Sequence, residues 1–172
     1  EYGGVVYAFR DNAGGSAGVM HKSTSSGWVV VSTPTLAAGG SYEFVNHNFG
    51  GHSSTLNMYG CNGVNKAFQF NGTTLTLLTT GMTTDTPSHI GVHKNHLFLS
   101  FSGGSVQHSG TGDPTSWTLV TGAGEISIGS EVTGLNSMQG NSLAITGNNQ
   151  VSVLYGTAAS NWDLKSYSPA IG

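Results

Sequence analysis

Charged side chains are scarce in this sequence. Only 8% of the 172 residues are charged, about a third of the usual share of about 25%. Disordered chains combine high charge with few aromatic and β-branched residues, so this chain falls outside that class. The basic residues are scattered rather than clustered, which leaves no strong signal for nucleic-acid binding. They are Arg10, Lys22, Lys66, Lys94 and Lys165.

Cysteine and long apolar segments are lacking as well. Cys61 is the single cysteine, so no internal disulfide can form. The cysteine content therefore does not indicate whether the protein occupies an oxidising or a reducing compartment. No apolar run approaches the length of a membrane span, and no signal-peptide pattern opens the sequence. Residue 1 is Glu rather than Met, and we therefore expect the native polypeptide to extend further.

Strand-forming and turn-forming residues fill the sequence instead. The chain contains 27 glycines, and 9% of its residues are aromatic. Val, Ile, Thr and aromatic residues suit pleated strands, whereas Gly and Asn suit the tight turns between them. The composition therefore predicts an all-β protein.

Four stretches of the chain repeat one arrangement. Each opens with a strand of alternating apolar residues, passes through a Gly/Asn-rich turn into a second strand, and closes with a further strand. The connecting segments supply a fourth strand; in residues 87–95, for example, Ile90 and Val92 fall on one face. The four stretches are residues 5–33, 55–80, 96–122 and 142–168.

One aromatic position marks each repeat. The closing strand begins at Trp28, Trp117 or Trp162, and Leu75 takes this place in the second copy. That copy shortens its loop to Asn71–Gly72, the preferred two-residue hairpin turn. The marker positions are 47, 42 and 45 residues apart, so one unit returns at the period of a propeller blade.

These repeats predict a β-propeller-like array of about four blades. A single small sheet leaves apolar faces in water, so we expect the blades to stack and the Trp to fill the gap between neighbours. A β-sandwich or jelly roll is the alternative, since regular short strands also build those folds. We expect residues 1–172 to form a single repeat domain, or a fragment of a larger propeller. The approximate blades are residues 1–40, 41–86, 87–130 and 131–172.

Three phrases of the sequence resemble a group of tailed-bacteriophage virion proteins. They are "YGCNGVNKAFQFNG" (59–72), "PSHIGVHKNHLFLSFSGGSVQHSGTGDP" (87–114) and "LYGTAASNWDLKSYS" (154–168). The resemblance extends over almost the whole chain and implies a structural component of the virion, in the tail or neck, with a propeller-like repeat. Members of that group tend to be longer and can carry an inserted segment where this chain has the short stretch 33–40.

The histidines of residues 87–96 are the best candidates for metal ligands. Imidazole binds Zn, Cu or Ni, but on a regular strand His89 and His93 lie about 13 Å apart, too far to share one ion. His96 follows across a turn, and no Cys or acidic residue lies near them in the sequence. We assign no metal or cofactor site and interpret these histidines as exposed strand and turn residues.

Catalytic motifs are weak. Glu125 and Glu131 are the pair of carboxylates that could converge through one loop for glycoside hydrolysis, but their spacing alone does not establish a site. Cys61 has no neighbouring His in the sequence, and no G-x-S-x-G motif occurs. We assign no catalytic residue and do not expect an enzyme.

Three functions follow in order of support. The first is a structural virion protein that binds other virion proteins and assembles as a symmetric homo-oligomer. The second is a propeller that binds a host receptor or glycan, with Tyr59, Tyr155 and Trp162 as stacking residues. The third is a hydrolase that uses Glu125 and Glu131.

Overall fold

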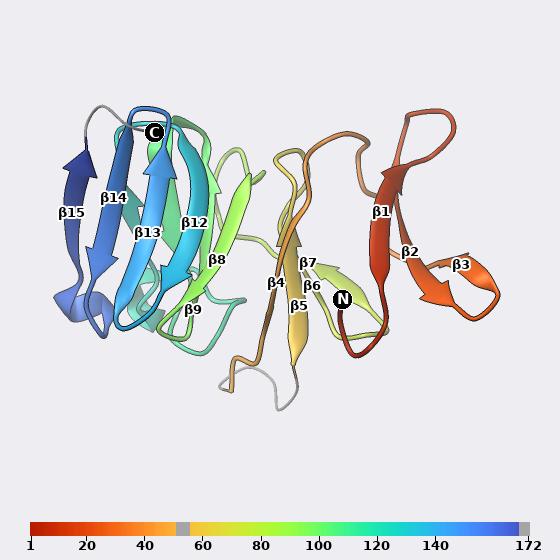
Figure 1. Cartoon of the computed structure of the whole chain (residues 1–172), viewed down its shortest axis with the longest axis horizontal. Helices are drawn as coiled ribbons and strands as arrows, with labels where there is room; N and C mark the ends of the chain where they lie inside the picture. Colours follow the sequence, from red (N-terminus) through yellow and green to blue (C-terminus); the bar gives the residue numbers. More distant parts are fainter. Residues whose placement is uncertain (51–55, 169–172) are drawn as a thin grey trace.

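The chain forms an open row of small antiparallel sheets. The computed structural model describes residues 1–50 and 56–168. It is all-β, with four sheets of three or four strands, none of which closes into a barrel. Figure 1 shows the sheets following one another along the long axis, in the order of the sequence. The predicted all-β, propeller-like array is therefore confirmed.

Parts of the expected repeats lie outside the described residues. These parts are residues 51–55, within the second blade, and residues 169–172, at the end of the fourth blade. It stays a prediction that residues 1–172 form a single repeat domain or a fragment of a larger propeller.

The first sheet has three strands. They are β1 (Tyr7–Asp11), β2 (Gly18–Thr24) and β3 (Gly27–Val30), in the order β1-β2-β3. The turn between β1 and β2 is held by Asn12, whose Oδ1 accepts a hydrogen bond of 2.9 Å from the Ser16 N–H.

The second sheet has four strands. They are β4 (Glu43–His47), β5 (Asn57–Cys61), β6 (Phe68–Phe70) and β7 (Leu75–Leu77). Asn71 and Gly72 turn the chain from β6 to β7, as predicted. The Thr74 N–H donates to Asn71 Oδ1 at 2.8 Å, and Gly72 has a φ of 94°, a conformation that favours glycine.

The third sheet is the most completely buried. Its strands are β8 (His89–His93), β9 (His96–Phe101), β10 (Ser105–His108) and β11 (Gly124–Ser127). Lys94 and Asn95 form the turn between β8 and β9 with φ of 47° and 61°, as a two-residue hairpin of the favoured twist requires.

The fourth sheet consists of β12 (Val132–Met138), β13 (Ser142–Gly147), β14 (Gln150–Tyr155) and β15 (Asp163–Ser168). The pairing of β12 with β13 shifts between Val132 and Gly134, which explains the poor alternation of residues 131–141.

The helical content is small. In residues 1–50 and 56–168 it consists of three turns of 3-10 helix, which are η1 (Ser102–Gly104), η2 (Leu119–Thr121) and η3 (Ala159–Asn161). Among the described residues, no helix has the length and apolar character that a membrane span requires.

Each middle sheet packs against two neighbours. We call the side that contacts the sheet before it the preceding face, and the side that contacts the sheet after it the following face. In β9, Leu97 and Leu99 join the cluster that contains Tyr59 of the second sheet. Phe98 joins the cluster that contains Leu143 of the fourth sheet. Because side chains alternate along a strand, β9 is buried on both faces.

Aromatic rings join the first sheet to the second. The ring of Phe9 stacks on Tyr42 with centroids 4.4 Å apart, and it lies 5.5 Å from the ring of Phe68. Met20 of β2 is fully buried in the same cluster. This contact covers the following face of the first sheet.

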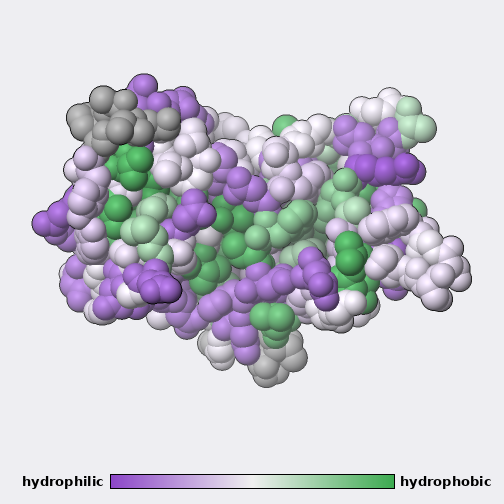
Figure 2. Space-filling view, viewed as in Figure 1, coloured by the Kyte–Doolittle hydropathy of each residue, from purple (hydrophilic) through white to green (hydrophobic). Residues whose placement is uncertain are grey.

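The two ends of the row stay uncovered. Figure 1 places the first and fourth sheets at opposite ends of the molecule. The preceding face of the first sheet and the following face of the fourth sheet therefore have no neighbouring sheet among the described residues. Figure 2 shows hydrophobic residues along the middle of the same view, with hydrophilic residues above and below them.

Gly60 tests the packing of the aromatic rings of the second sheet that contact Phe9 of the first sheet. A Cβ on this residue would lie 2.4 Å from the ring of Phe68 and 2.9 Å from the ring of Phe44. We expect Gly60→Ala to lower the free energy of unfolding by about 1–3 kcal/mol, measured by urea denaturation. Gly14→Ala is the control, because its Cβ would meet nothing closer than 3.8 Å. Equal stability of the two variants would contradict the packing described.

Candidate functional site

The preceding face of the first sheet is the candidate site. The register of the sheet places Ala8, His21 and Val30 in one row across β1, β2 and β3. Because alternate residues of a strand share a face, Arg10 and Trp28 lie on the same side as this row. The sheet therefore presents an indole, a guanidinium and an imidazole together on its uncovered face.

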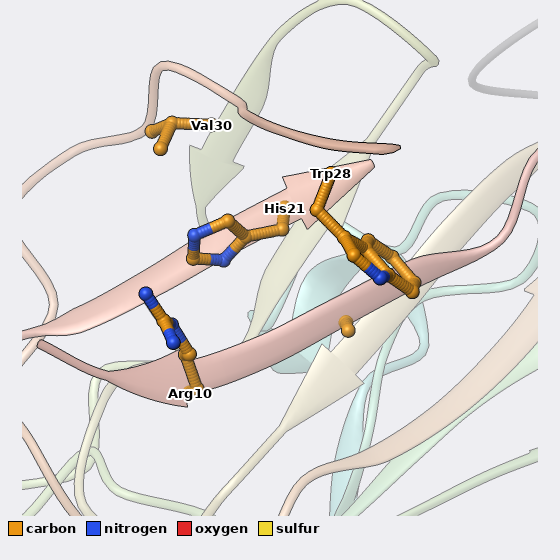
Figure 3. A pocket seen from close by; sticks show the side chains of 5 residues that line it. Arg10, His21, Trp28 and Val30 are labelled. Carbon is orange, nitrogen blue, oxygen red and sulfur yellow. The ribbon is translucent and has the colours of Figure 1, made fainter. Parts of the chain in front are cut away.

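These side chains line a groove of about 540 Å³. Figure 3 shows Trp28 and Val30 on one strand, His21 on the next, and the Arg10 guanidinium directed toward His21. Three strands contribute to the groove, so its shape depends on the folded sheet rather than on one loop.

A tight turn sets the position of Trp28. The Ser26 N–H donates to Thr24 Oγ1 at 3.2 Å, and the Thr24 hydroxyl donates to the Gly27 carbonyl at 2.8 Å. Gly27 has a φ of 119°, which a residue with a side chain rarely adopts. Trp28 follows directly and is 56% exposed.

The equivalent positions of the other repeats are covered. Leu75 is buried in the cluster between the first and second sheets. Trp117 packs against the cluster between the second and third sheets, and Trp162 against the cluster between the third and fourth. Leu75 begins β7, and Trp162 directly precedes β15. Trp117 lies in the loop before β11, so the prediction that the closing strand of the third repeat begins at Trp117 is wrong, because this strand begins at Gly124. The prediction that the marker fills a gap between blades is confirmed for Trp117 and Trp162 and wrong for Trp28, because no sheet precedes the first one in the described structure.

The groove has an apolar surface and hydrogen-bond donors that a ligand could use. The indole offers a flat apolar surface, and Arg10 and His21 add hydrogen-bond donors. Its lining contains no carboxylate, thiol or hydroxyl. The alternation of residues 5–11 and 18–24 assigns Arg10 and His21 each to one face of its own strand, and the register of the three strands brings them together with Trp28.

Three histidines surround Trp162 between the third and fourth sheets. His93, His96 and His108 are all buried. The rings of His96 and His108 have centroids 5.0 Å and 4.6 Å from the indole of Trp162. The prediction of exposed histidines is therefore wrong for His93 and His96, because the fourth sheet covers the following face of β8 and β9.

This histidine cluster is uncharged at neutral pH. The Nδ1–H groups of His96 and His108 both donate to the Ser109 carbonyl, at 2.6 Å and 3.2 Å. Burial lowers the pKa of His93 and His96, and it lowers the pKa of His108 to about 4. His93 Nε2 and Trp162 Nε1 are buried without a hydrogen-bond partner in the part of the chain that the structure describes.

The candidate metal ligands His89, His93 and His96 do not share one site, because they contact different residues. His89 is half-buried, and its Nδ1 lies 2.7 Å from Glu43 Oε1 of the second sheet. His93 and His96 belong instead to the cluster around Trp162. Within residues 1–50 and 56–168, no three His, Cys, Asp or Glu side chains are grouped so that they could hold a metal ion.

The candidate catalytic groups have separate partners. Glu125 accepts a hydrogen bond of 2.7 Å from the Ser105 hydroxyl, and Glu131 accepts one of 2.9 Å from the Gly103 N–H. Cys61 is buried in β5, and burial raises the pKa of its thiol, which keeps it protonated and poorly nucleophilic at neutral pH.

Of the aromatic residues predicted to stack on sugars, two are in the interior and one is at the surface. Tyr59 is fully buried, and Trp162 lies in the histidine cluster. Tyr155 does reach the surface, where its hydroxyl lies 2.6 Å from that of Tyr167. The sequence analysis did not propose Trp28, the most exposed of the three indoles.

Comparisons with known proteins assign neither a family nor a function to this chain. No family model matches the chain, and no curated protein matches it.

The histidine cluster makes stability depend on pH. An unfolded His takes up a proton near pH 6.5, whereas folded His108 stays neutral down to about pH 4. The unfolded state therefore binds more protons in this interval, and the free energy of unfolding falls as the pH is lowered through it. For His108 alone the full difference corresponds to about 3 kcal/mol.

We expect His108→Phe to reduce this pH dependence. The substitution keeps an aromatic ring beside Trp162 and removes the titrating nitrogen atoms. Urea denaturation at a series of pH values between 7 and 4 measures the slope. Gly14→Ala, which removes no titrating group, is the control and should keep the slope of the parent protein. An unchanged slope in His108→Phe would contradict this account.

Proposed function

We propose that this chain is a structural component of a bacteriophage virion, in the tail or neck, where it acts as a rigid assembly module. The single observation that supports this best is the uncovered face of the first sheet. Trp28, Val30 and Val6 are exposed there, on a face that is covered in every other sheet. The resemblance of residues 59–72, 87–114 and 154–168 to virion proteins supplies the setting.

The low charge of the chain supports assembly. Burying a charged side chain at an interface requires the removal of its water, which is unfavourable unless a partner compensates. With 8% charged residues, the surface presents few such groups to a neighbouring subunit. Hydroxyl and amide side chains accept water-mediated contacts more readily.

The separate hydrogen bonds of Glu125 and Glu131 favour this function over hydrolysis. Each carboxylate is tied to a nearby turn or strand by a hydrogen bond. A hydrolytic pair would need both groups to face one substrate at a defined separation.

We expect the chain to be present in purified particles of the phage that encodes it, at a fixed ratio to the major capsid protein, as measured by quantitative mass spectrometry. Trp28→Asp should lower its incorporation at least about tenfold, because large aromatic residues dominate interface energies. Val120→Asp is the control, since Val120 is 98% exposed outside the sheets. Absence of the chain from wild-type particles would refute this function.

A second function is favoured by the composition of the groove. An exposed indole beside Arg10 and His21 is able to stack on a sugar ring and bind its hydroxyl or carboxylate groups. The chain would then recognise a host surface glycan.

Calorimetric titration with polysaccharide purified from the host surface tests this second function. We expect saturable binding that is lost in Trp28→Ala and retained in Tyr155→Ala, which alters the other end of the molecule. Binding that persists in Trp28→Ala would exclude the groove as the glycan site.

A further inference from the structure

The exposure of Trp28 follows a rule that the other three repeats obey. In each later repeat, the marker residue packs against the cluster shared with the preceding sheet, whether it lies in a strand, as Leu75 does, or in the segment before the closing strand, as Trp117 and Trp162 do. Trp28 occupies the corresponding place in the first repeat, whose sheet has no predecessor in the part of the chain that the structure describes. Trp28 is therefore exposed because no sheet packs on it in the described structure, and its place in the repeat corresponds to that of the three covered markers.

The fourth sheet carries the complementary face. In the second and third sheets, the following face is the one that receives the marker of the next sheet. In the fourth sheet it is uncovered among the described residues. It presents Met138 of β12, Tyr155 of β14 and Tyr167 of β15, the last of which is 60% exposed. The two tyrosine hydroxyls lie 2.6 Å apart, which places both rings at one site.

We propose that the preceding face of the first sheet binds the following face of the fourth sheet of a second copy. The inference rests on the proposed function and specifies the contact through which the module assembles. The contact repeats the internal order of the sheets, so the row continues from one copy into the next. Such a head-to-tail contact closes into a ring or extends into a filament, depending on the rotation between copies.

Charge favours this pairing over a contact between two first sheets. The groove of the first sheet carries Arg10 and His21 and no acidic residue. Two such faces together would bring two guanidinium groups close to one another, which is unfavourable. The outer strand of the fourth sheet offers Asp163, which is exposed and lies 3.2 Å from Lys165.

The aromatic residues are complementary as well. At the internal contact, the indole of Trp162 lies against the rings of His96, Phe98 and His108. At the proposed contact, the rings of Tyr155 and Tyr167 would pack against the indole of Trp28, as the rings of the third sheet pack against Trp162. A guanidinium over a tyrosine ring gains further attraction, which gives Arg10 a partner on this face.

Sedimentation velocity and native mass spectrometry of the purified chain test the contact over a range of concentrations. We expect reversible association of the parent protein. Trp28→Asp and Tyr167→Asp should each weaken it at least about tenfold. Val120→Asp should leave it unchanged, and circular dichroism verifies that each variant is folded. A parent protein that stays monomeric at high concentration would overturn the proposal and leave a further sheet of the same polypeptide as the occupant.

Mixing the two defective variants tests the head-to-tail geometry. Trp28→Asp keeps an intact fourth sheet, and Tyr167→Asp keeps an intact first sheet. The mixture should therefore form a one-to-one heterodimer at concentrations where neither variant associates alone. Failure to form it overturns the head-to-tail contact. If the chain associates head to tail but is absent from phage particles, only the virion function is refuted. If the chain is found in particles but stays monomeric in solution, only this contact is refuted.

Discussion

The structure depends on the burial of apolar sheet faces against one another. A sheet of four short strands has apolar side chains on both sides and cannot cover them by itself. In β9 all six residues are buried, which requires a sheet on each side of the strand. The second and fourth sheets provide these neighbours and contribute Tyr59 and Leu143 to the two clusters that β9 joins. The same requirement holds at the ends of the row, where the described chain does not satisfy it.

The ends of the row therefore connect the fold to its proposed function. In the proposed assembly, the contact between copies would be of the same kind as the contact that stabilises the interior of the row. Trp28 illustrates this point, since Trp117 and Trp162, at the corresponding places of later repeats, pack against a preceding sheet, whereas Trp28 is exposed. The polar and weakly charged surface elsewhere presents few ionic groups that could direct binding. The proposed contacts with partners therefore lie on the two end faces.

Much of this arrangement was predictable from local patterns. The all-β class, the Asn71–Gly72 turn and the burial of Ile90 follow from strand and turn preferences that neighbouring residues encode. The burial of His93 and His96 was not predictable in this way, because it depends on how the fourth sheet lies on the third. Alternation assigns a side chain to a face but does not say whether another sheet covers that face. The groove escaped the sequence analysis for the same reason, since it depends on the register of three strands.

The first sheet is held less completely than the others, and this bears on assembly. It has three strands and one neighbouring sheet, and a few contacts reinforce its position. The Tyr2 hydroxyl donates to the Leu56 carbonyl at 2.6 Å, and Asp11 accepts a hydrogen bond from the Gly39 N–H. A partner that binds only the folded sheet adds its binding free energy to the stability of that sheet. Docking on the Trp28 face would therefore stabilise the least supported sheet of the row, so that assembly and local folding strengthen each other.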